Sequence, residues 1–194
     1  MPTALVTGGA VRLGRSIALY LAGRGYNIAL HYGSSRESAE QTAEETRKFG
    51  IQCKTYCVDF TNLDSIPLLM DQVLADFSSI DLLVNSAANF IQKKLEEISN
   101  QELLDTININ LMAPFILMRE FKKKVNNGLI INILDERILR RVSTFGAYSV
   151  SKSALAHLTE LSAVSWGETI RVNGIAPGLI LPPSGSSDEY LIKN

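Results

Sequence analysis

Short runs of aliphatic residues alternate along the chain with longer segments in which apolar residues recur every three or four positions. The short runs predict buried strands, and the longer segments predict helices that bury one face. The predicted strands are Thr3–Thr7, Tyr26–His31, Ile51–Val58, Asp81–Asn85, Gly128–Leu134 and Ile170–Ile175. The predicted helices are Leu13–Ala22, Arg36–Phe49, Leu63–Phe77, Gln101–Lys124 and Gly146–Trp166.

This alternation of strands and helices predicts repeated βαβ units. Such units place parallel strands in one sheet and helices on both of its faces. We therefore expect an α/β fold with a Rossmann-like, doubly wound parallel sheet. No repeat, linker or low-complexity stretch divides the chain, which indicates a single domain over residues 1–194. The residues that follow Ile175 have the composition of a loop.

Composition and charge exclude several classes of protein. Hydrophobic residues make up 46% of the chain and charged residues 20%, as in globular proteins. The net charge of −1 provides no basic field for nucleic acid. No apolar run approaches the ~20 residues of a membrane span, and the N-terminus lacks the pattern of a signal peptide. We therefore expect a soluble, cytoplasmic protein with no membrane or nucleic-acid partner.

Two cysteines, Cys53 and Cys57, lie four residues apart in the third predicted strand. They are too distant along a strand to form a comfortable disulfide, and no third ligand stands near them for a metal. We expect buried, reduced thiols and no metal site.

Two short motifs carry the candidate chemistry. The stretch TGGAVRLG, Thr7–Gly14, is a glycine turn between the first strand and the first helix, where backbone N–H groups can bind phosphate. The stretch AYSVSK places Tyr148 and Lys152 on one face of a helix. A nearby ammonium favours phenolate, so we expect Lys152 to lower the pKa of Tyr148 and make it a better proton donor. The alternative is a Tyr–Lys pair on the helix surface.

The chain resembles the short-chain dehydrogenase/reductase superfamily in five motifs that follow one another in the expected order. They are TGGAVRLG, NSAA at Asn85–Ala88, ININL with Asn110, Tyr148-x-x-x-Lys152, and IAPG, which ends in Pro177–Gly178. The resemblance covers essentially the whole chain. It implies that Tyr148 is the catalytic acid, that Asn110 supports a proton relay, and that Lys152 binds the nicotinamide ribose. It also implies a set of cofactor-binding residues, which are Thr7, Gly8, Arg12, Leu13, Gly14, Asp59, Asn85, Ala87, Pro177 and Gly178.

Three residues depart from the wider superfamily and resemble its pteridine reductases. Arg12 stands where most members have glycine, and Asp135 stands where most have serine, thirteen residues before Tyr148. Phe90 lies three residues after Ala87, where pteridine reductases have a phenylalanine that stacks on the pterin. The resemblance implies that Arg12, Phe90, Asp135 and Tyr148 bind the substrate, with Asp135 shuttling a proton. Alternatives are phosphate neutralisation by Arg12, core packing of Phe90 and a turn hydrogen bond of Asp135.

The segment after the second predicted strand bears on the choice of cofactor. Enzymes of this fold that use NAD end this strand with an acidic residue, but this chain has none before Glu37. His31, Ser34, Ser35 and Arg36 instead offer donors to a 2′-phosphate. The sequence therefore predicts NADPH as cofactor.

Three functions remain open at this point. The first is NADPH-dependent reduction of a pterin C=N bond, the second is reduction of a keto-acyl or other small carbonyl substrate, and the third is a non-catalytic NADPH-binding sensor. The resemblance also implies a homo-oligomer, which we expect to be a tetramer. Apolar residues on the two longest predicted helices favour it, namely Leu111, Phe115, Leu155 and Leu158. We interpret His157 as a structural or interface residue. Family members continue into a substrate-covering segment and a last strand, so we expect both to be absent from this sequence.

Overall fold

Six parallel strands form a single sheet in the computed structural model, which describes residues 1–139 and 144–180. Their order across the sheet is β3-β2-β1-β4-β5-β6. The strands are β1 (Thr3–Val6), β2 (Asn27–Tyr32), β3 (Cys53–Cys57), β4 (Leu82–Asn85), β5 (Gly128–Ile133) and β6 (Ile170–Ile175). The predicted doubly wound parallel sheet is confirmed. Because β1 pairs with both β2 and β4, the winding reverses at the carboxyl ends of β1 and β4, where such sheets bind ligands.

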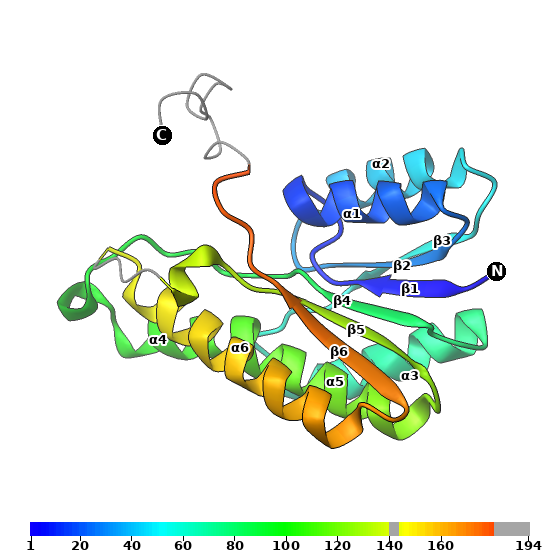
Figure 1. Cartoon of the computed structure of the whole chain (residues 1–194). Coiled ribbons are helices and arrows are strands. Elements are labelled where there is room, and N and C mark those ends of the chain that lie inside the picture. Colours follow the sequence, from blue (N-terminus) through cyan, green and yellow to red (C-terminus); the bar gives the residue numbers. More distant parts are fainter. Residues whose placement is uncertain (140–143, 181–194) are drawn as a thin grey trace.

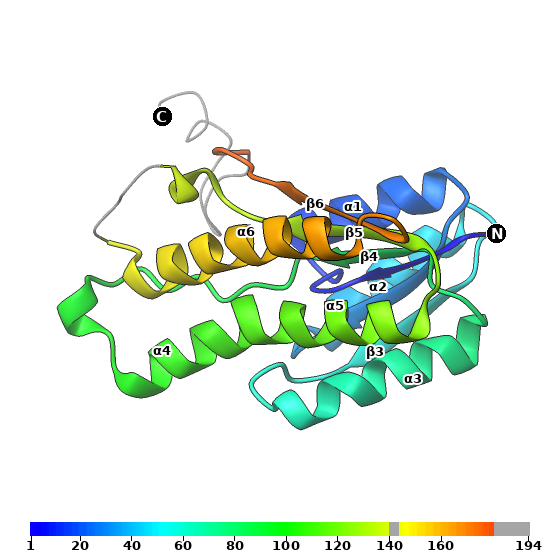
Figure 2. The same cartoon turned by 60° about the horizontal axis from the view of Figure 1, so that its bottom comes forward.

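Helices cover both faces of the sheet (Figures 1 and 2). The helices α1 and α2 lie on one face, and α3, α5 and α6 lie on the other. The helices are α1 (Arg12–Gly23), α2 (Arg36–Arg47), α3 (Ile66–Phe77), α4 (Asn100–Ile107), α5 (Ala113–Lys124) and α6 (Gly146–Trp166). In the described ranges, none of them is long and apolar enough to cross a membrane.

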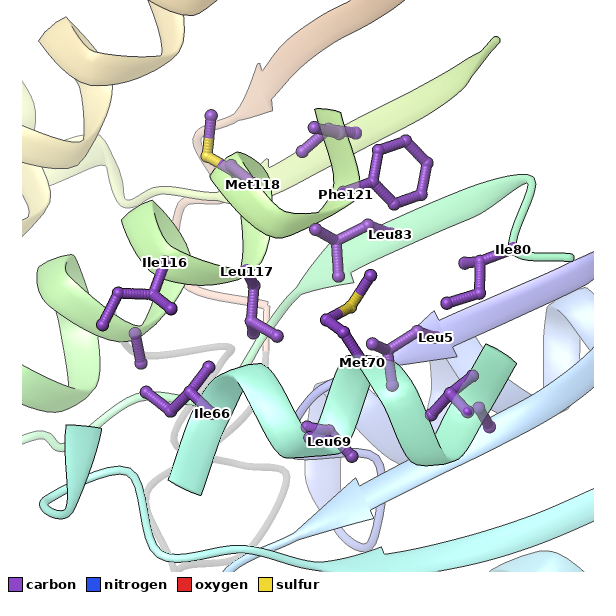
Figure 3. Packing of buried hydrophobic residues seen from close by; sticks show 14 of the residues in the cluster. Leu5, Ile66, Leu69, Met70, Ile80, Leu83, Ile116, Leu117, Met118 and Phe121 are labelled. Atoms are coloured by element: carbon purple, nitrogen blue, oxygen red, sulfur yellow. The ribbon is translucent and has the colours of Figure 1, made fainter. Parts of the chain in front are cut away.

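Each face of the sheet carries its own hydrophobic core. Alanines of α1 and α2 pack against one face, where small side chains let the helices approach the strands closely. Larger side chains fill the other face, as Figure 3 shows for Leu5, Leu83, Met70 and Phe121. Burial of these apolar side chains is the main stabilising contribution to the fold.

The segment predicted as one helix, Gln101–Lys124, is divided in the structure. The helix α4 ends at Ile107, a π-helical turn covers Asn108–Met112, and α5 begins at Ala113. Pro114 gives a physical reason, since it has no N–H to donate to the carbonyl of Asn110 four residues earlier. Wide π turns of this kind occur often at functional sites, and this one contains Asn110.

Other differences are local. The helix α2 ends two residues before Phe49, and a 3₁₀ turn, Leu63–Ser65, precedes α3. Cys53 is buried as expected, but Cys57 is exposed, so the prediction of two buried thiols is wrong for Cys57. It lies at the end of the edge strand β3, and its thiol donates to the Gly33 carbonyl at 3.2 Å. Both cysteines are free thiols. The predicted C-terminal loop from residue 181 onward lies outside the described residues.

Candidate active site

The glycine turn connects the end of β1 to the start of α1. Gly8 has φ +64°, which glycine adopts without strain. A Cβ atom on Gly14 would lie 2.1 Å from the carbonyl oxygen of Gly8, so no larger residue fits there. The turn is therefore as tight as a backbone cradle for phosphate requires, at the N-terminus of a helix. Leu13 is half-buried and packs toward the core under α1.

Arg12 adopts a backbone conformation that residues other than glycine rarely adopt. Its φ is +51°, in the left-handed region that favours glycine, while its side chain is exposed. A non-glycine residue held in such a conformation costs roughly 1–3 kcal/mol and is often retained for function. The turn therefore keeps the glycine-like shape expected from the sequence and adds a guanidinium at its rim.

Thr7 ties this turn to the segment after β4. Its hydroxyl accepts hydrogen bonds from the backbone N–H groups of Ser86 and Ala87, at 3.0 and 3.1 Å, and donates to the carbonyl of Val84 at 3.3 Å. A Cβ on Gly8 would lie 2.8 Å from Cα of Ala87. The two predicted cofactor-binding segments are thus in direct contact at the point where the winding reverses.

A buried series of side-chain hydrogen bonds lies beneath that contact. The Asn85 amide donates to the Asn132 side chain at 2.8 Å, and the Asn132 amide donates to the Thr159 hydroxyl at 2.8 Å. Asn132 is fully buried in the sheet. It was not singled out by sequence reasoning, because a lone asparagine inside an apolar strand carries no motif. These hydrogen bonds connect β4, β5 and α6 beneath the site.

His31 lies inside the protein rather than at its surface. Its ring is 2% exposed and stacks on Phe60 with the centroids 4.0 Å apart. Nδ1 accepts a hydrogen bond from the Gly8 N–H at 3.2 Å, so Nε2 carries the proton and lies 2.9 Å from the Val58 carbonyl. Burial lowers the pKa of His31 to about 4. The prediction that His31 offers a donor to a 2′-phosphate is therefore not supported; its ring supports the glycine turn.

The other predicted phosphate-binding residues do face solvent. Ser34, Ser35 and Arg36 are exposed between β2 and the N-terminus of α2. Asp59 is also exposed, just beyond the neighbouring strand β3, and its carboxylate accepts from the Thr61 N–H at 2.9 Å. The two segments are adjacent because β2 and β3 are paired up to their carboxyl ends.

Tyr148 and Asp135 meet as a hydrogen-bonded pair. Tyr148 lies in the first turn of α6, and Asp135 follows β5 as the N-cap of a 3₁₀ turn, Glu136–Ile138. The phenol donates to Oδ2 of Asp135 at 3.0 Å. The Tyr148 side chain is buried, and the Asp135 side chain is 14% exposed. The thirteen-residue spacing noted in the sequence thus brings the two groups into direct contact.

The protonation balance of Tyr148 differs from the expectation. Burial, followed by the negative charge of Asp135 and the hydrogen bond to it, raises the pKa of Tyr148 well above its ordinary value. Lys152 lies with Nζ 5.8 Å from the centroid of the tyrosine ring and donates to the Ile133 carbonyl at 2.6 Å. Burial lowers the pKa of Lys152 to about 8. The prediction that the pKa of Tyr148 is lowered by Lys152 is therefore wrong, because in the structure this pKa is raised.

Phe90 forms a wall beside Tyr148. Its ring is 53% exposed and meets the Tyr148 ring edge-on, with the centroids 4.7 Å apart. It also stacks on Phe145 with the centroids 4.7 Å apart. Phe90 is therefore not a core residue, and part of its ring is available to a ligand. Sequence reasoning missed Phe145 and Arg137, whose guanidinium lies over both phenylalanine rings.

Asn110 supports the site from the π turn. It is fully buried, its amide donates to the Asn89 carbonyl and the Ser151 hydroxyl, and its oxygen accepts from the Asn89 N–H at 2.7 Å. The Ser151 hydroxyl in turn donates to the Tyr148 carbonyl. Asn110 thus joins α6 to the segment next to Phe90.

Pro177 and Gly178 lie beside the segment of Asp135. The Pro177 carbonyl accepts from the Glu136 N–H at 3.0 Å, and Gly178 lies near the Glu136 carboxylate. All the predicted site segments therefore gather at the carboxyl edge of the sheet. Within the described residues no group of three or more His, Cys, Asp or Glu side chains could hold a metal ion.

Comparison with known proteins gives a consistent result. The family model described as short chain dehydrogenase matches residues 2–189. The chain is 32% identical to the 3-oxoacyl-acyl-carrier-protein reductase FabG of Staphylococcus aureus, over 92% of this chain and 74% of that protein.

Two solved structures are also similar. Acetoin dehydrogenase YohF from Salmonella typhimurium has a TM-score of 0.88 at 26% identity, covering 97% of this chain and 76% of its own. An NAD⁺-bound xylitol dehydrogenase has a TM-score of 0.86 at 29% identity, covering 93% of this chain and 71% of its own.

Proposed function

The chain belongs to the short-chain dehydrogenase family, and we propose that it is an NADPH-dependent reductase of a pterin C=N bond with Tyr148 as proton donor. As a member of this family it is an oxidoreductase that works with a nicotinamide cofactor. The observation that carries the finer proposal is the Asp135–Tyr148 hydrogen bond. A sensor without chemistry finds no support, because the relatives described above are reductases and dehydrogenases.

The residues at the carboxyl edge of the sheet fit a dinucleotide. Gly8 and Gly14 leave no room for a Cβ, so the backbone of the turn packs closely against the start of α1. The N–H groups of Gly8 and Gly9 are bonded to His31, and we assign the pyrophosphate to the N-terminus of α1. Arg12 adds a positive charge at the rim of this turn. Lys152, which is buried on α6, is the residue that would hold the nicotinamide ribose.

The choice of NADPH over NADH rests on the segment that follows β2. The exposed residues there are Ser34, Ser35 and Arg36, which suit a 2′-phosphate, and no carboxylate precedes Glu37. His31 is excluded from this role by its burial. The three exposed residues are therefore the ones that we assign to cofactor preference.

The chemistry divides into a hydride transfer and a proton transfer. When bound, the reduced nicotinamide supplies the hydride, two electrons and one hydrogen nucleus, to the carbon of the C=N bond. The ring nitrogen must gain one proton, and we assign Tyr148 as its donor. Asp135 accepts the phenolic hydrogen bond and, once protonated from solvent, can return a proton to the phenolate.

Asp135 is better suited to a C=N bond than to a ketone. A ketone that gains a hydride develops a negative oxygen, which needs donors around it. A carboxylate beside Tyr148 offers only acceptors and negative charge. A ring nitrogen instead has to be protonated, which a carboxyl group can assist. The exposed part of the Phe90 ring adds a flat surface for a heteroaromatic substrate.

The second candidate is reduction of a keto-acyl or other small carbonyl substrate. The names of the relatives support this candidate more directly than they support pterin reduction, since FabG is a 3-oxoacyl-acyl-carrier-protein reductase. At 32% identity the substrate can differ within a family, and the substitution of the usual serine by Asp135 favours the first candidate.

We also propose that residues 1–194 form one domain and that the protein assembles as a homotetramer. An apolar hollow of about 350 Å³ lies on the surface of α5 and α6, lined by Leu111, Met112, Phe115, Ala154, His157, Leu158 and Leu161. Leu155, which was expected on this surface, is instead buried within the protomer. Sedimentation as a monomer at micromolar concentration would contradict the assembly.

The experiment that tests the function measures NADPH oxidation with oxidised pterins, dihydropterins, folates and β-keto esters. The proposal expects turnover with at least one pterin or folate. Tyr148→Phe should abolish turnover of every substrate while NADPH binding, followed by fluorescence, is retained. Tyr20→Phe is the matched control, because Tyr20 is 62% exposed on α1 and is not one of the proposed site residues. Turnover of keto esters alone would replace the first candidate by the second.

A further inference from the structure

We propose that Arg137 is a positioning residue of the proton donor, holding the Asp135 carboxylate toward Tyr148 while two aromatic rings hold Arg137 itself. This inference rests on the proposed role of Tyr148. Neither the sequence motifs nor the family resemblance points to Arg137. It emerges from the contacts that surround the Asp135–Tyr148 pair.

Arg137 binds both oxygens of the carboxylate. Its Nη1 donates to Oδ1 and Oδ2 of Asp135 at 3.2 and 3.1 Å, and its backbone N–H donates to Oδ1 at 2.8 Å. The Tyr148 phenol donates to Oδ2. The carboxylate thus accepts bonds from one guanidinium nitrogen, a backbone group and a phenol, which together restrict its rotation. Charge-assisted bonds of this kind are the stronger ones in proteins.

The guanidinium is fixed from its other side by aromatic rings. Cζ of Arg137 lies 4.6 Å from the centroid of Phe145 and 5.5 Å from that of Phe90. Its Nε is buried and has no hydrogen-bond partner among the described residues. The electron-rich faces of the two rings attract the guanidinium. Arg137 is 25% exposed, which limits the screening of its charge by water. The five side chains Arg137, Asp135, Tyr148, Phe90 and Phe145 form one continuous cluster.

This placement has a consequence for the proton of Tyr148. The charged groups that shift the pKa of the phenol are Asp135 and Arg137, and Lys152 Nζ lies 5.8 Å from the centroid of the same ring. Asp135 raises the pKa of Tyr148, and the positive charge of Arg137 opposes that rise. Loss of Arg137 leaves the negative charge of Asp135 unbalanced, which makes Tyr148 a weaker acid. It also frees the carboxylate to turn away. Both effects lower the rate of proton donation.

The test is a double-mutant cycle on kcat at saturating NADPH. Its members are the wild type, Arg137→Met, Asp135→Asn and the double variant, and Arg137→Lys tests rescue by the charge alone. We expect Arg137→Met to lower kcat about tenfold or more, within the range of coupled neighbours. Arg137→Lys should recover part of that loss. In the Asp135→Asn background, Arg137→Met should change kcat by less than about twofold.

Two controls separate this effect from damage to the fold. The NADPH dissociation constant, measured by fluorescence, should stay within about twofold of wild type in every variant. Arg24→Met is the matched surface variant, because Arg24 also lies over an aromatic ring, that of Tyr20, at 5.1 Å. It should leave kcat unchanged. A purely structural role would lower kcat equally in both Asp135 backgrounds and would overturn the proposal, as would an Arg137→Lys variant no better than Arg137→Met.

Failure of the proposed function would give a different result. If the wild type reduces no compound of the panel, the function fails, and the same cycle is read from the NMR signal of isotope-labelled Tyr148, assigned with Tyr148→Phe. We expect Arg137→Met to shift this signal in the wild-type background and to leave it in place in the Asp135→Asn background. An equal shift in both backgrounds, or none in either, would refute the positioning role without any substrate.

Discussion

Acidification should destabilise the protein through one buried histidine. His31 is neutral in the folded chain, with its pKa lowered to about 4 from the ordinary 6.5. Protonation would place a second N–H on Nδ1, directly facing the Gly8 N–H that it now accepts. The buried imidazolium would lose that bond and gain a repulsive contact within the glycine turn.

The shift sets the size and the pH window of the effect. Between pH 6.5 and about 4 the unfolded chain binds a proton that the folded chain does not, so stability falls as the pH falls through this window. The full difference of 2.5 units corresponds to about 3 kcal/mol at 1.36 kcal/mol per unit. About 2 kcal/mol of it should already be lost between pH 7 and roughly pH 5.

The assay is urea unfolding at a series of pH values, repeated for two variants. His31→Asn keeps an acceptor for the Gly8 N–H but cannot titrate, so its stability should depend less on pH by about 2 kcal/mol over this interval. His157→Asn is the matched control, because His157 is the only other histidine and is largely exposed. It should retain the acid sensitivity of the wild type. Equal pH dependence in wild type and His31→Asn would refute the reasoning.

Three further substitutions test the cofactor and substrate sites. Gly14→Ala should abolish NADPH binding and cost roughly 1–3 kcal/mol of stability, because its Cβ would collide with the Gly8 carbonyl oxygen of the same turn. Gly23→Ala is its control, since a Cβ there would lie 3.5 Å from the nearest atom, and it should leave both NADPH binding and stability unchanged. Arg36→Gln should raise KM for NADPH at least about fivefold and leave KM for NADH unchanged, and an equal rise for both would count against a 2′-phosphate contact. Phe90→Ala should lower pterin kcat/KM tenfold or more, from a stacking contribution of about 1–3 kcal/mol, and affect a small ketone less. Phe49→Ala, with 54% exposure against 53%, is its control.

Patterns that act over a few residues predict this fold well. The strands follow from their aliphatic runs, and the doubly wound parallel arrangement follows from the rules of βαβ winding. The break within Gln101–Lys124 was missed, although Pro114 marks it, because apolar periodicity continues through the π turn. Periodicity reports which face is buried and does not by itself mark where one helix ends and the next begins.

The candidate site was predictable where spacing determines contact. Asp135 lies just after a strand and Tyr148, thirteen residues later, lies in the first turn of a helix, and the two side chains meet. The environment of His31 could not be read from the sequence, since its burial depends on Phe60 and Val58 beyond the neighbouring strand. The predicted direction of the pKa shift of Tyr148 was wrong for the same reason. Burial and Asp135 outweigh Lys152, and burial is a property of the folded chain.

The most direct test of the central claim compares two substrates in two proteins. The kcat/KM for a dihydropterin, divided by that for a β-keto ester, is measured with NADPH for the wild type and for Asp135→Ser. Glu160→Gln, an exposed carboxylate on α6, serves as control. The account predicts a wild-type ratio in favour of the pterin that falls at least about tenfold in Asp135→Ser, because the serine restores a donor for a developing alkoxide. An unchanged ratio, or a wild type that prefers the keto ester, would contradict it.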